Sequence, residues 1–255
     1  MTPVPAELVA SLRADPARTA LLLDFDGTLA PIVEDPASSR PLPEIPAALD
    51  RLADRFALVA VVSGRPAAFL QAHLGSGPTL VGLYGLEQVR GGVVVENPAA
   101  GSWRAVVDEA AVAAAAELPA EVGIEHKGLS LTLHVRTCPE HAVAVEAWAV
   151  EGAARWGLRH GTAKRSAELH PPVELDKGTV VDALLEQAGV DVACFIGDDV
   201  GDLPAFDAID RFVDDGGEGH KVVVASEEAA PELLATADVV LAGPQEVLDL
   251  LRSLF

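Results

Sequence analysis

Short apolar runs alternate with segments of helical periodicity in the first third of the chain. In one of these segments apolar residues recur at Ile45, Leu49, Leu52 and Phe56, which is the spacing of one helix face. We predict strands at 20–23, 57–62 and 80–84, and helices at 45–56 and 66–74. Alternation of strands with helices is typical of a parallel sheet covered by helices on both faces.

The pattern changes after the third predicted strand. A Gly-Gly pair inside an apolar run predicts a hairpin over 89–95. We predict helices at 103–118 and 141–156, and strands at 124–126, 129–135, 158–162 and 165–169. The second of these strands alternates strictly between apolar and polar residues, so one of its faces is polar. This block is α+β with antiparallel strands, which indicates an inserted domain over 103–171, closed by Pro171 and Pro172.

From Lys177 onward the alternation of strands and helices resumes. We predict helices at 178–187, 200–209 and 245–254, and strands at 192–196, 222–225 and 239–241. The segments 1–102 and 172–255 then form one α/β core domain with a Rossmann-like parallel sheet. The acidic stretch 210–219 is expected to be a solvated loop.

The chain carries a formal net charge of −21. So acidic a chain repels nucleic acid and anionic membranes, which proteins bind mainly through Lys and Arg. No uncharged apolar run approaches the ~18 residues of a membrane helix, and the first residues lack the basic start and apolar stretch of a signal peptide. We expect a cytoplasmic monomer that binds a small molecule, and neither nucleic acid nor a membrane. An anionic small molecule would need a metal ion or a local group of basic residues at its site.

Polar side chains follow three predicted strands of the core domain. Asp24 and Asp26 follow the first strand, Ser63 the second, and Asp198 and Asp202 a later one. Ligands of open parallel sheets bind beyond the carboxyl ends of the strands. We therefore expect these five residues around one site.

The carboxylates of this site indicate a magnesium ion. Several carboxylates close together cannot all stay ionised without a cation, and oxygen ligands of this kind suit Mg²⁺, which shares its shell with a substrate phosphate. Taken singly, Asp26-Gly27 is more often a turn, Ser63 an ordinary strand end, and Lys177 an exposed helix start. A calcium loop fits poorly, because its glycine stands at loop position 6. The order of these residues through the βα pattern favours the functional interpretation.

These residues resemble the four motifs of the haloacid dehalogenase superfamily of phosphatases. The motifs match 24–28 (Asp-Phe-Asp-Gly-Thr), Ser63 within 62–65, Lys177, and 197–202 (Gly-Asp-Asp-Val-Gly-Asp). The insertion lies between the second and third motifs, where this superfamily carries its α+β type of cap. The resemblance covers nearly the whole chain and implies a core domain of the haloacid dehalogenase type with an inserted substrate-specificity cap domain.

Within the superfamily the chain is similar to the trehalose-6-phosphate phosphatases. Ala30-Pro31 follows the first motif as in that family, and the insertion carries Glu-x-Lys at 125–127, His-x-Arg at 134–136 and Lys-x-x-x-Glu at 164–168. The resemblance implies that four cap residues hold the sugar hydroxyls: Glu125, Lys127, Lys164 and Glu168. Charged groups of both signs suit such a ligand, since they bind hydroxyls through charge-assisted hydrogen bonds.

The chain departs from the family's usual pattern at several positions. Tyr84 stands where the family usually has His, Gly201 where Thr is common, and His170 where Arg is frequent. Leu203-Pro204 follows the last motif in place of a common Glu. None of these changes removes a predicted nucleophile or metal ligand, and they leave the sugar phosphate less defined than the reaction.

The resemblance implies a two-step phosphoryl transfer with Mg²⁺ as cofactor. Asp24 attacks phosphorus and becomes an aspartyl phosphate, while Asp26 protonates the leaving sugar oxygen and then deprotonates water. The metal site comprises four aspartates: Mg²⁺ is held by Asp24, the Asp26 carbonyl and Asp198, and Asp202 orients metal-bound water or Lys177. Five residues are expected to contact the substrate, the first four at its phosphoryl oxygens: Thr28, Ser63, Gly64, Lys177 and Arg65.

The expected reaction is the hydrolysis of trehalose 6-phosphate to trehalose and phosphate. The nearest alternative is a phosphatase of the same architecture acting on another sugar phosphate, such as sucrose 6-phosphate or a mannosyl or glucosyl phosphoglycerate. A second alternative is a non-catalytic module that senses a sugar phosphate. Asp24 and Asp26 argue against it, because binding alone needs neither a nucleophile nor an acid/base. A phosphomutase stays open, although Asp26 favours hydrolysis.

Overall fold

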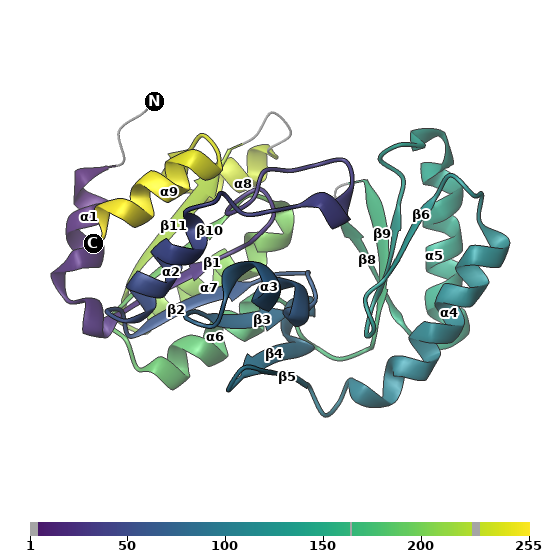
Figure 1. Cartoon of the computed structure of the whole chain (residues 1–255), viewed down its shortest axis with the longest axis horizontal. Helices are drawn as coiled ribbons and strands as arrows, with labels where there is room; N and C mark the ends of the chain where they lie inside the picture. Colours follow the sequence, from purple (N-terminus) through teal and green to yellow (C-terminus); the bar gives the residue numbers. More distant parts are fainter. Residues whose placement is uncertain (1–4, 164, 226–229) are drawn as a thin grey trace. The chain divides into compact units, whose positions relative to one another are not determined.

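The chain divides into two compact units in a computed structural model that describes residues 5–163, 165–225 and 230–255 (Figure 1). The first unit combines Met1–Val95 with Leu175–Phe255, and the second is Glu96–Glu174. The sequence placed the boundaries of the insertion at 103 and 171, both of which fall inside the second unit. The chain leaves the first unit once and returns to it once.

Within the described residues, the first unit is built on an eight-stranded sheet with the order β12-β11-β10-β1-β2-β3-β4-β5. Neighbouring strands from β12 to β3 are parallel, and β4 is antiparallel to β3. The strands are β1 (Thr19–Leu23), β2 (Leu58–Val62), β3 (Thr79–Gly82), β4 (Glu87–Arg90), β5 (Val93–Glu96), β10 (Val192–Gly197), β11 (Glu218–Val224) and β12 (Val239–Leu241). The predicted parallel α/β sheet is confirmed.

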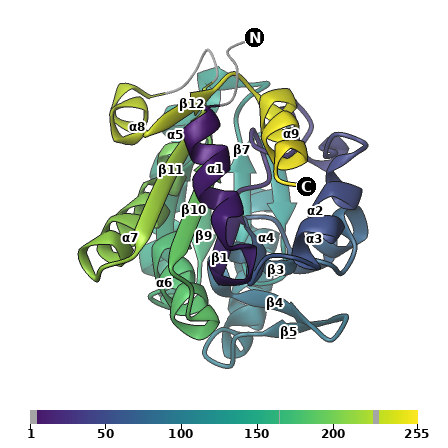
Figure 2. The ribbon, with the colours of Figure 1, turned by 90° about the vertical axis from the view of Figure 1, so that its left-hand side faces the viewer.

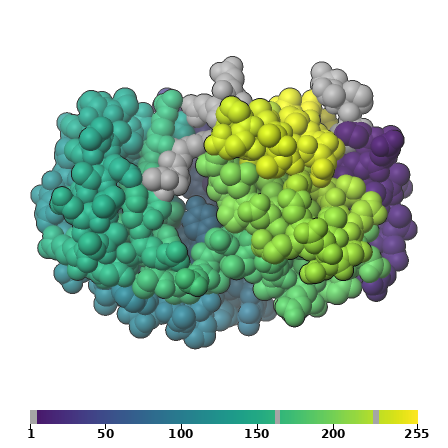
Figure 3. Space-filling view, turned by 180° about the vertical axis from the view of Figure 1, so that it is seen from behind, coloured from purple at the N-terminus to yellow at the C-terminus, as the bar shows by residue number. Residues whose placement is uncertain are grey.

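Two layers of helices cover this sheet (Figure 2). One face carries α1 (Ala6–Ala14), α2 (Ile45–Ala53), α3 (Ala67–Leu74) and α9 (Pro244–Ser253). The other face carries α6 (Lys177–Ala188), α7 (Leu203–Asp214) and α8 (Pro231–Thr236). The outer surface of α6 and α7 is seen in green and yellow-green in Figure 3.

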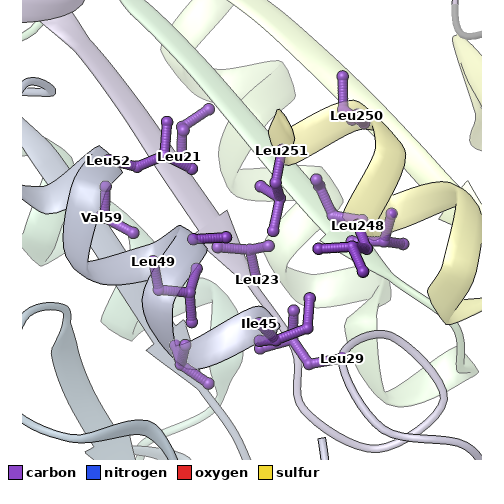
Figure 4. Packing of buried hydrophobic residues seen from close by; sticks show 14 of the residues in the cluster. Leu21, Leu23, Leu29, Ile45, Leu49, Leu52, Val59, Leu248, Leu250 and Leu251 are labelled. Atoms are coloured by element: carbon purple, nitrogen blue, oxygen red, sulfur yellow. The ribbon is translucent and has the colours of Figure 1, made fainter. Parts of the chain in front are cut away.

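Alternate residues of β1 point to opposite faces of the sheet. Leu21 and Leu23 belong to the cluster with α2 and α9, and Ala20 and Leu22 to the cluster with α6 and α7. Figure 4 shows Leu21 and Leu23 among the leucines of α2 and α9. Each fully buried leucine stabilises the fold by roughly 1.5–3 kcal/mol. The strand is therefore fixed on both sides immediately before Asp24.

The second unit has, in its described part, a four-stranded antiparallel sheet with the order β6-β7-β9-β8. The strands are β6 (Gly123–His126), β7 (Leu131–His134), β8 (Arg159–Ala163) and β9 (Ser166–His170), and the helices are α4 (Arg104–Glu117) and α5 (Ala142–Trp156). Leu131, Leu133 and Leu169 pack under these helices. Thr132 and Glu168, which pair across β7 and β9, lie on the opposite, polar face because side chains alternate along a strand.

Two sequence predictions about the first unit are wrong. The strand predicted to reach Tyr84 ends at Gly82, because Leu83 and Tyr84 turn into the left-handed region with φ of 48° and 56°. Most of the predicted loop 210–219 is ordered as the end of α7 and the start of β11. Phe212, near the end of α7, still packs partly buried against the core, and β11 gains backbone hydrogen bonds by pairing with β10 from Glu218 onward.

Three smaller features of the chain also bear on the sequence predictions. The helices α1 and α8 had no counterpart among the predicted elements. A short hairpin of β4 and β5 follows the Gly-Gly prediction. Over the described residues, we find no helix with the length and hydrophobicity needed to cross a membrane.

Candidate active site

The ends of two adjacent strands place the central carboxylates. β1 and β10 pair in parallel, with Leu23 opposite Ile196, so Asp24 and Asp198 follow neighbouring strands at the same edge of the sheet. The Asp24 N–H donates to the Ile196 carbonyl at 2.9 Å. Both side chains are buried, as is that of Asp202 at the start of α7. Oxygens of Asp24, Asp198 and Asp202 lie within 4.8 Å of one another, as the sequence predicted.

Lys177 joins two of these carboxylates. Its Nζ donates to Asp24 Oδ1 at 2.7 Å and to Asp202 Oδ1 at 2.5 Å. Asp202 Oδ2 accepts from the backbone N–H groups of Asp198 and Asp199 at 2.9 and 3.0 Å. Asp202 thus uses one oxygen to hold Lys177 and the other to hold the loop that carries Asp198. Asp202 therefore contacts Lys177, and its predicted role toward a metal-bound water stays a prediction.

The cluster is electrostatically unbalanced. Burial raises the pKa of Asp24 well above its usual value, Asp202 and Asp198 add to that rise, and Lys177 acts against it. Burial alone would lower the pKa of Lys177, but Asp202, Asp24 and the phenol of Tyr84 raise it well above its usual value. The ammonium is therefore held charged between two carboxylates, and a third, that of Asp198, lies beside them. A cation beside Asp24 and Asp198 would remove the excess negative charge.

The loop after Asp24 is shaped for a close approach. Gly27 has φ of +77°, and a Cβ there would overlap the Asp198 carboxylate. Thr28 is fully buried, and among the described residues its Oγ1 has no hydrogen-bond partner. A buried hydroxyl without a partner is costly unless a ligand satisfies it. The residues of this loop fit a cation at Asp198 and a phosphoryl oxygen at Thr28.

Asp26 is held by Arg65. The Arg65 Nε donates to Asp26 Oδ2 at 2.6 Å, and an Nη donates to Oδ1 at 2.8 Å. Ser39 Oγ also donates to Oδ1, at 2.9 Å. The guanidinium is further fixed by the Pro36 carbonyl and lies 4.9 Å from the ring centre of Phe69. Bidentate pairs of this kind fix orientation as well as charge.

The loop after β2 lies beside these groups in the sheet. Ser63 is buried, its N–H donates to the Val81 carbonyl, and its Oγ accepts from the Arg65 N–H at 3.2 Å. The next residue, Gly64, carries no side chain, and a Cβ there would stand 2.5 Å from the hydroxyl oxygen of Tyr84. A glycine is therefore required for the phenol to pack at this point.

The second unit holds a separate polar cluster. On the polar face of its sheet, Lys127 Nζ lies 3.6 Å from Glu168 Oε1 and 3.9 Å from Glu125 Oε2. Ser130 and Thr132 donate their hydroxyls to Glu168 Oε1 at 3.1 and 3.3 Å. Three of the four predicted sugar-binding residues are thus gathered on one surface of this unit.

Most of the predicted site residues are brought together in their own units. Lys164 lies outside the described residues. Arg65 contacts Asp26, and its predicted contact with substrate stays a prediction. Ser39 was missed, because a serine in a loop 13 residues from Asp26 has no recognisable sequence signal. Tyr84 appeared in the sequence only as a departure from the family pattern.

The sequence is similar to a known protein family and to several curated proteins. Residues 22–238 match the family model described as trehalose-phosphatase. A curated trehalose-phosphate phosphatase from Mycobacterium ulcerans is 36% identical over 202 residues, which cover 75% of this chain and 52% of the relative. One from Mycobacterium bovis is 34% identical over 233 residues, covering 83% and 58%. The chain spans about half the length of the curated relatives it matches.

Solved structures show the same fold. The C-terminal domain of the trehalose-6-phosphate phosphatase of C. albicans has a TM-score of 0.77 at 24% identity, with 100% of this chain and 98% of that chain covered. An Aspergillus fumigatus trehalose-6-phosphate phosphatase has a TM-score of 0.63 at 26% identity, with 98% and 96% covered. A haloacid dehalogenase-like hydrolase from Bacteroides thetaiotaomicron has a TM-score of 0.61. With the family model matching most of its length, the chain belongs to the trehalose-phosphatase family.

Proposed function

We propose that this chain hydrolyses trehalose 6-phosphate to trehalose and phosphate, with Asp24 as the nucleophile. The observation that carries the proposal is the buried cluster in which Lys177 joins Asp24 to Asp202 beside Asp198. Family membership indicates the disaccharide phosphate, and the acidic, hydroxyl-bearing face of the second unit suits a sugar.

The reaction proceeds in two steps at phosphorus. A carboxylate oxygen of Asp24 attacks phosphorus, the bond from phosphorus to the sugar oxygen breaks, and Asp26 gives its proton to that oxygen. A water then attacks the phosphorus of the aspartyl phosphate while Asp26 takes its proton, which regenerates Asp24 and releases phosphate. In this structure Arg65 and Ser39 hold both carboxylate oxygens of Asp26, so Asp26 must release one contact with Arg65 before it carries the proton.

Charge on the phosphoryl oxygens is met by groups of the first unit. Lys177 supplies a fixed ammonium, and Thr28 and Ser63 supply hydroxyls. The residues that would hold Mg²⁺ are Asp24, Asp198 and the Asp26 carbonyl. When bound, this ion would neutralise carboxylates and phosphoryl oxygens. Its binding can be measured apart from activity, by calorimetry of the wild type and of Asp198→Asn, which should bind Mg²⁺ at least about tenfold more weakly.

The test is phosphate release from a panel of sugar phosphates with and without Mg²⁺. Trehalose 6-phosphate should be the preferred substrate over glucose 6-phosphate, sucrose 6-phosphate and the glycosyl phosphoglycerates. Asp24→Asn, which keeps the shape of the side chain, should lose at least about 10⁴-fold of the activity. Equal turnover of glucose 6-phosphate would overturn the disaccharide assignment, and undiminished activity of Asp24→Asn would overturn the mechanism.

The predictions of a cytoplasmic monomer that binds no nucleic acid belong to the same proposal. The net charge of −21 supports the exclusion of nucleic acid. Light scattering coupled to size-exclusion chromatography would give the mass in solution, and a mass of twice 26.4 kDa would contradict the monomer.

A further inference from the structure

The turn that follows β3 has an unusual backbone. Leu83, Tyr84 and Gly85 all have positive φ, of 48°, 56° and 102°. Two consecutive residues with side chains in this region are uncommon, because the Cβ crowds the backbone. Such strain persists where the surrounding structure imposes it, and it often lies at functional sites. The contacts of this turn therefore indicate its role.

The turn lies against the loop after β2. The Tyr84 N–H donates to the Ser63 carbonyl at 3.1 Å, and the Leu83 N–H donates to the Arg65 carbonyl at 3.0 Å. A Cβ on Gly64 would stand 2.5 Å from the Tyr84 hydroxyl oxygen and 2.6 Å from Cζ, so the outer end of the phenol packs on the Gly64 backbone. Backbone and side chain of Tyr84 therefore both contact this loop.

The loop that Tyr84 contacts carries two of the predicted phosphate-binding residues. Ser63 is buried, and its carbonyl accepts from the Tyr84 N–H, while the phenol lies on Gly64. The strained turn thus brings one residue against two of the groups that are expected to hold phosphoryl oxygens.

We propose that Tyr84 is a positioning residue of the phosphoryl site, whose backbone and phenol hold the Ser63–Gly64 backbone where it reaches the phosphoryl group. The inference rests on the proposed function and assigns a role to a residue at which this chain differs from the usual family pattern. It concerns the phosphoryl half of the substrate, so it does not depend on which sugar the chain accepts.

A direct test uses the fact that Tyr84 is the only tyrosine in the sequence. Chain labelled with 3-fluorotyrosine should give a single ¹⁹F resonance. Inorganic phosphate added with Mg²⁺ should shift this resonance, with the same concentration dependence as its inhibition of p-nitrophenyl phosphate hydrolysis. An unmoved resonance at inhibitory phosphate concentrations would overturn the inference. A shift in a chain that does not hydrolyse trehalose 6-phosphate would leave it standing and overturn the proposed substrate.

The kinetic test is Tyr84→Phe, which removes the hydroxyl and keeps the ring. The hydroxyl oxygen is the phenol atom nearest to Gly64, so its loss should loosen the Ser63–Gly64 backbone and lower kcat/KM by about 10-fold. The loss should be equal for trehalose 6-phosphate and p-nitrophenyl phosphate, because both share the phosphoryl group, and the melting temperature should not change. Tyr84→His, which restores a polar group, should recover part of the activity. A loss confined to the disaccharide, or a fall in melting temperature with unchanged activity, would contradict the positioning role.

A pair of substitutions tests the contact with Gly64. Gly64→Ala should impair the wild-type chain, because its Cβ displaces the phenol. In a Tyr84→Ala background the ring is gone, so the further loss of kcat/KM from Gly64→Ala should be within about twofold. Strictly additive losses would show that the glycine is needed for a reason other than Tyr84.

Discussion

The two units each place a lysine between two carboxylates, but in different ways. In the first unit, Lys177 Nζ lies 2.7 and 2.5 Å from Asp24 and Asp202, and both carboxylates are buried. In the second unit, Lys127 Nζ lies 3.6 and 3.9 Å from Glu168 and Glu125. The first arrangement has direct hydrogen bonds, whereas the second has ion pairs beyond hydrogen-bond length.

This difference in distance suits two different functions. A group that stabilises charge at phosphorus must be fixed before the reaction, since reorientation would raise the barrier. A surface that binds hydroxyls needs donors and acceptors that can take new partners. Glu168 already accepts from the hydroxyls of Ser130 and Thr132, the type of partner that a sugar offers. The two clusters have similar residues, and the distances from the lysine to its carboxylates distinguish them.

The largest effect is expected for Lys177→Met. The substitution leaves two buried carboxylates without their ammonium, and breaking a buried ion pair in this way costs about 3–5 kcal/mol. Urea denaturation without Mg²⁺ would measure the loss in the free energy of unfolding. Activity should disappear as well.

The matched variant in the second unit is Lys127→Met. Its ion pairs are longer, and Glu125 is partly exposed. Glu168 is buried, but it keeps the hydroxyls of Ser130 and Thr132, so the loss should be smaller, about 1–3 kcal/mol. Equal destabilisation by both substitutions would remove the distinction between the two clusters.

The second prediction concerns the acid/base beside the fixed cluster. Asp26→Asn should lower turnover of a sugar phosphate by about 10²–10⁴-fold, because a sugar oxygen leaves poorly without a proton. With p-nitrophenyl phosphate, whose leaving group needs no proton, the decrease should be much smaller. Arg65→Lys, which loses the bidentate contact with Asp26, should show the same dependence on the leaving group in weaker form. Equal losses on both esters would assign Asp26 to something other than proton transfer.

The third prediction addresses the sugar-binding face. Glu168→Gln keeps the size of the side chain and removes its charge. Ser130 and Thr132 donate hydrogen bonds to this carboxylate, and Lys127 forms an ion pair with it. The KM for trehalose 6-phosphate should rise about 10- to 100-fold with little change in kcat, as expected when an interaction common to ground and transition states is lost. Steady-state kinetics on both esters separates the two constants. A fall in kcat of the same size on p-nitrophenyl phosphate would mean that Glu168 acts on the chemical step.

The sequence predicted the first cluster better than its surroundings. Asp24, Asp198 and Lys177 could be placed from buried strands and a helix start, because strand ends in a parallel sheet share one edge. Tyr84 could not, since nothing in an apolar run announces a left-handed turn at Leu83. Nor could the Arg65–Asp26 pair, whose partners lie 39 residues apart.

The loop prediction for the acidic stretch 210–219 was wrong for a different reason. Its charges suggested a solvated loop, whereas Asp210 lies on the helix surface and pairs with Lys221 of β11 at 2.6 Å. The composition indicated the exposed face correctly, but it did not reveal that Phe212 still packs against the core. The side chains on one face of a helix do not show where the helix ends.

The smallest expected effect compares the resistance of the two units to opening. The described cysteines divide evenly, with Cys194 on β10 of the first unit and Cys138 after β7 of the second. Both are buried, and burial raises the pKa of Cys194, so a thiol reagent should label it only after opening.

Cys194 lies on a central strand between two helical layers, whereas Cys138 lies next to a short helical turn. In the single-cysteine variants Cys138→Ala and Cys194→Ala, Cys138 should react at least about tenfold faster than Cys194 in mild denaturant. Identical rates would show that the two units open together, in which case the tight and loose lysine clusters belong to one cooperative structure.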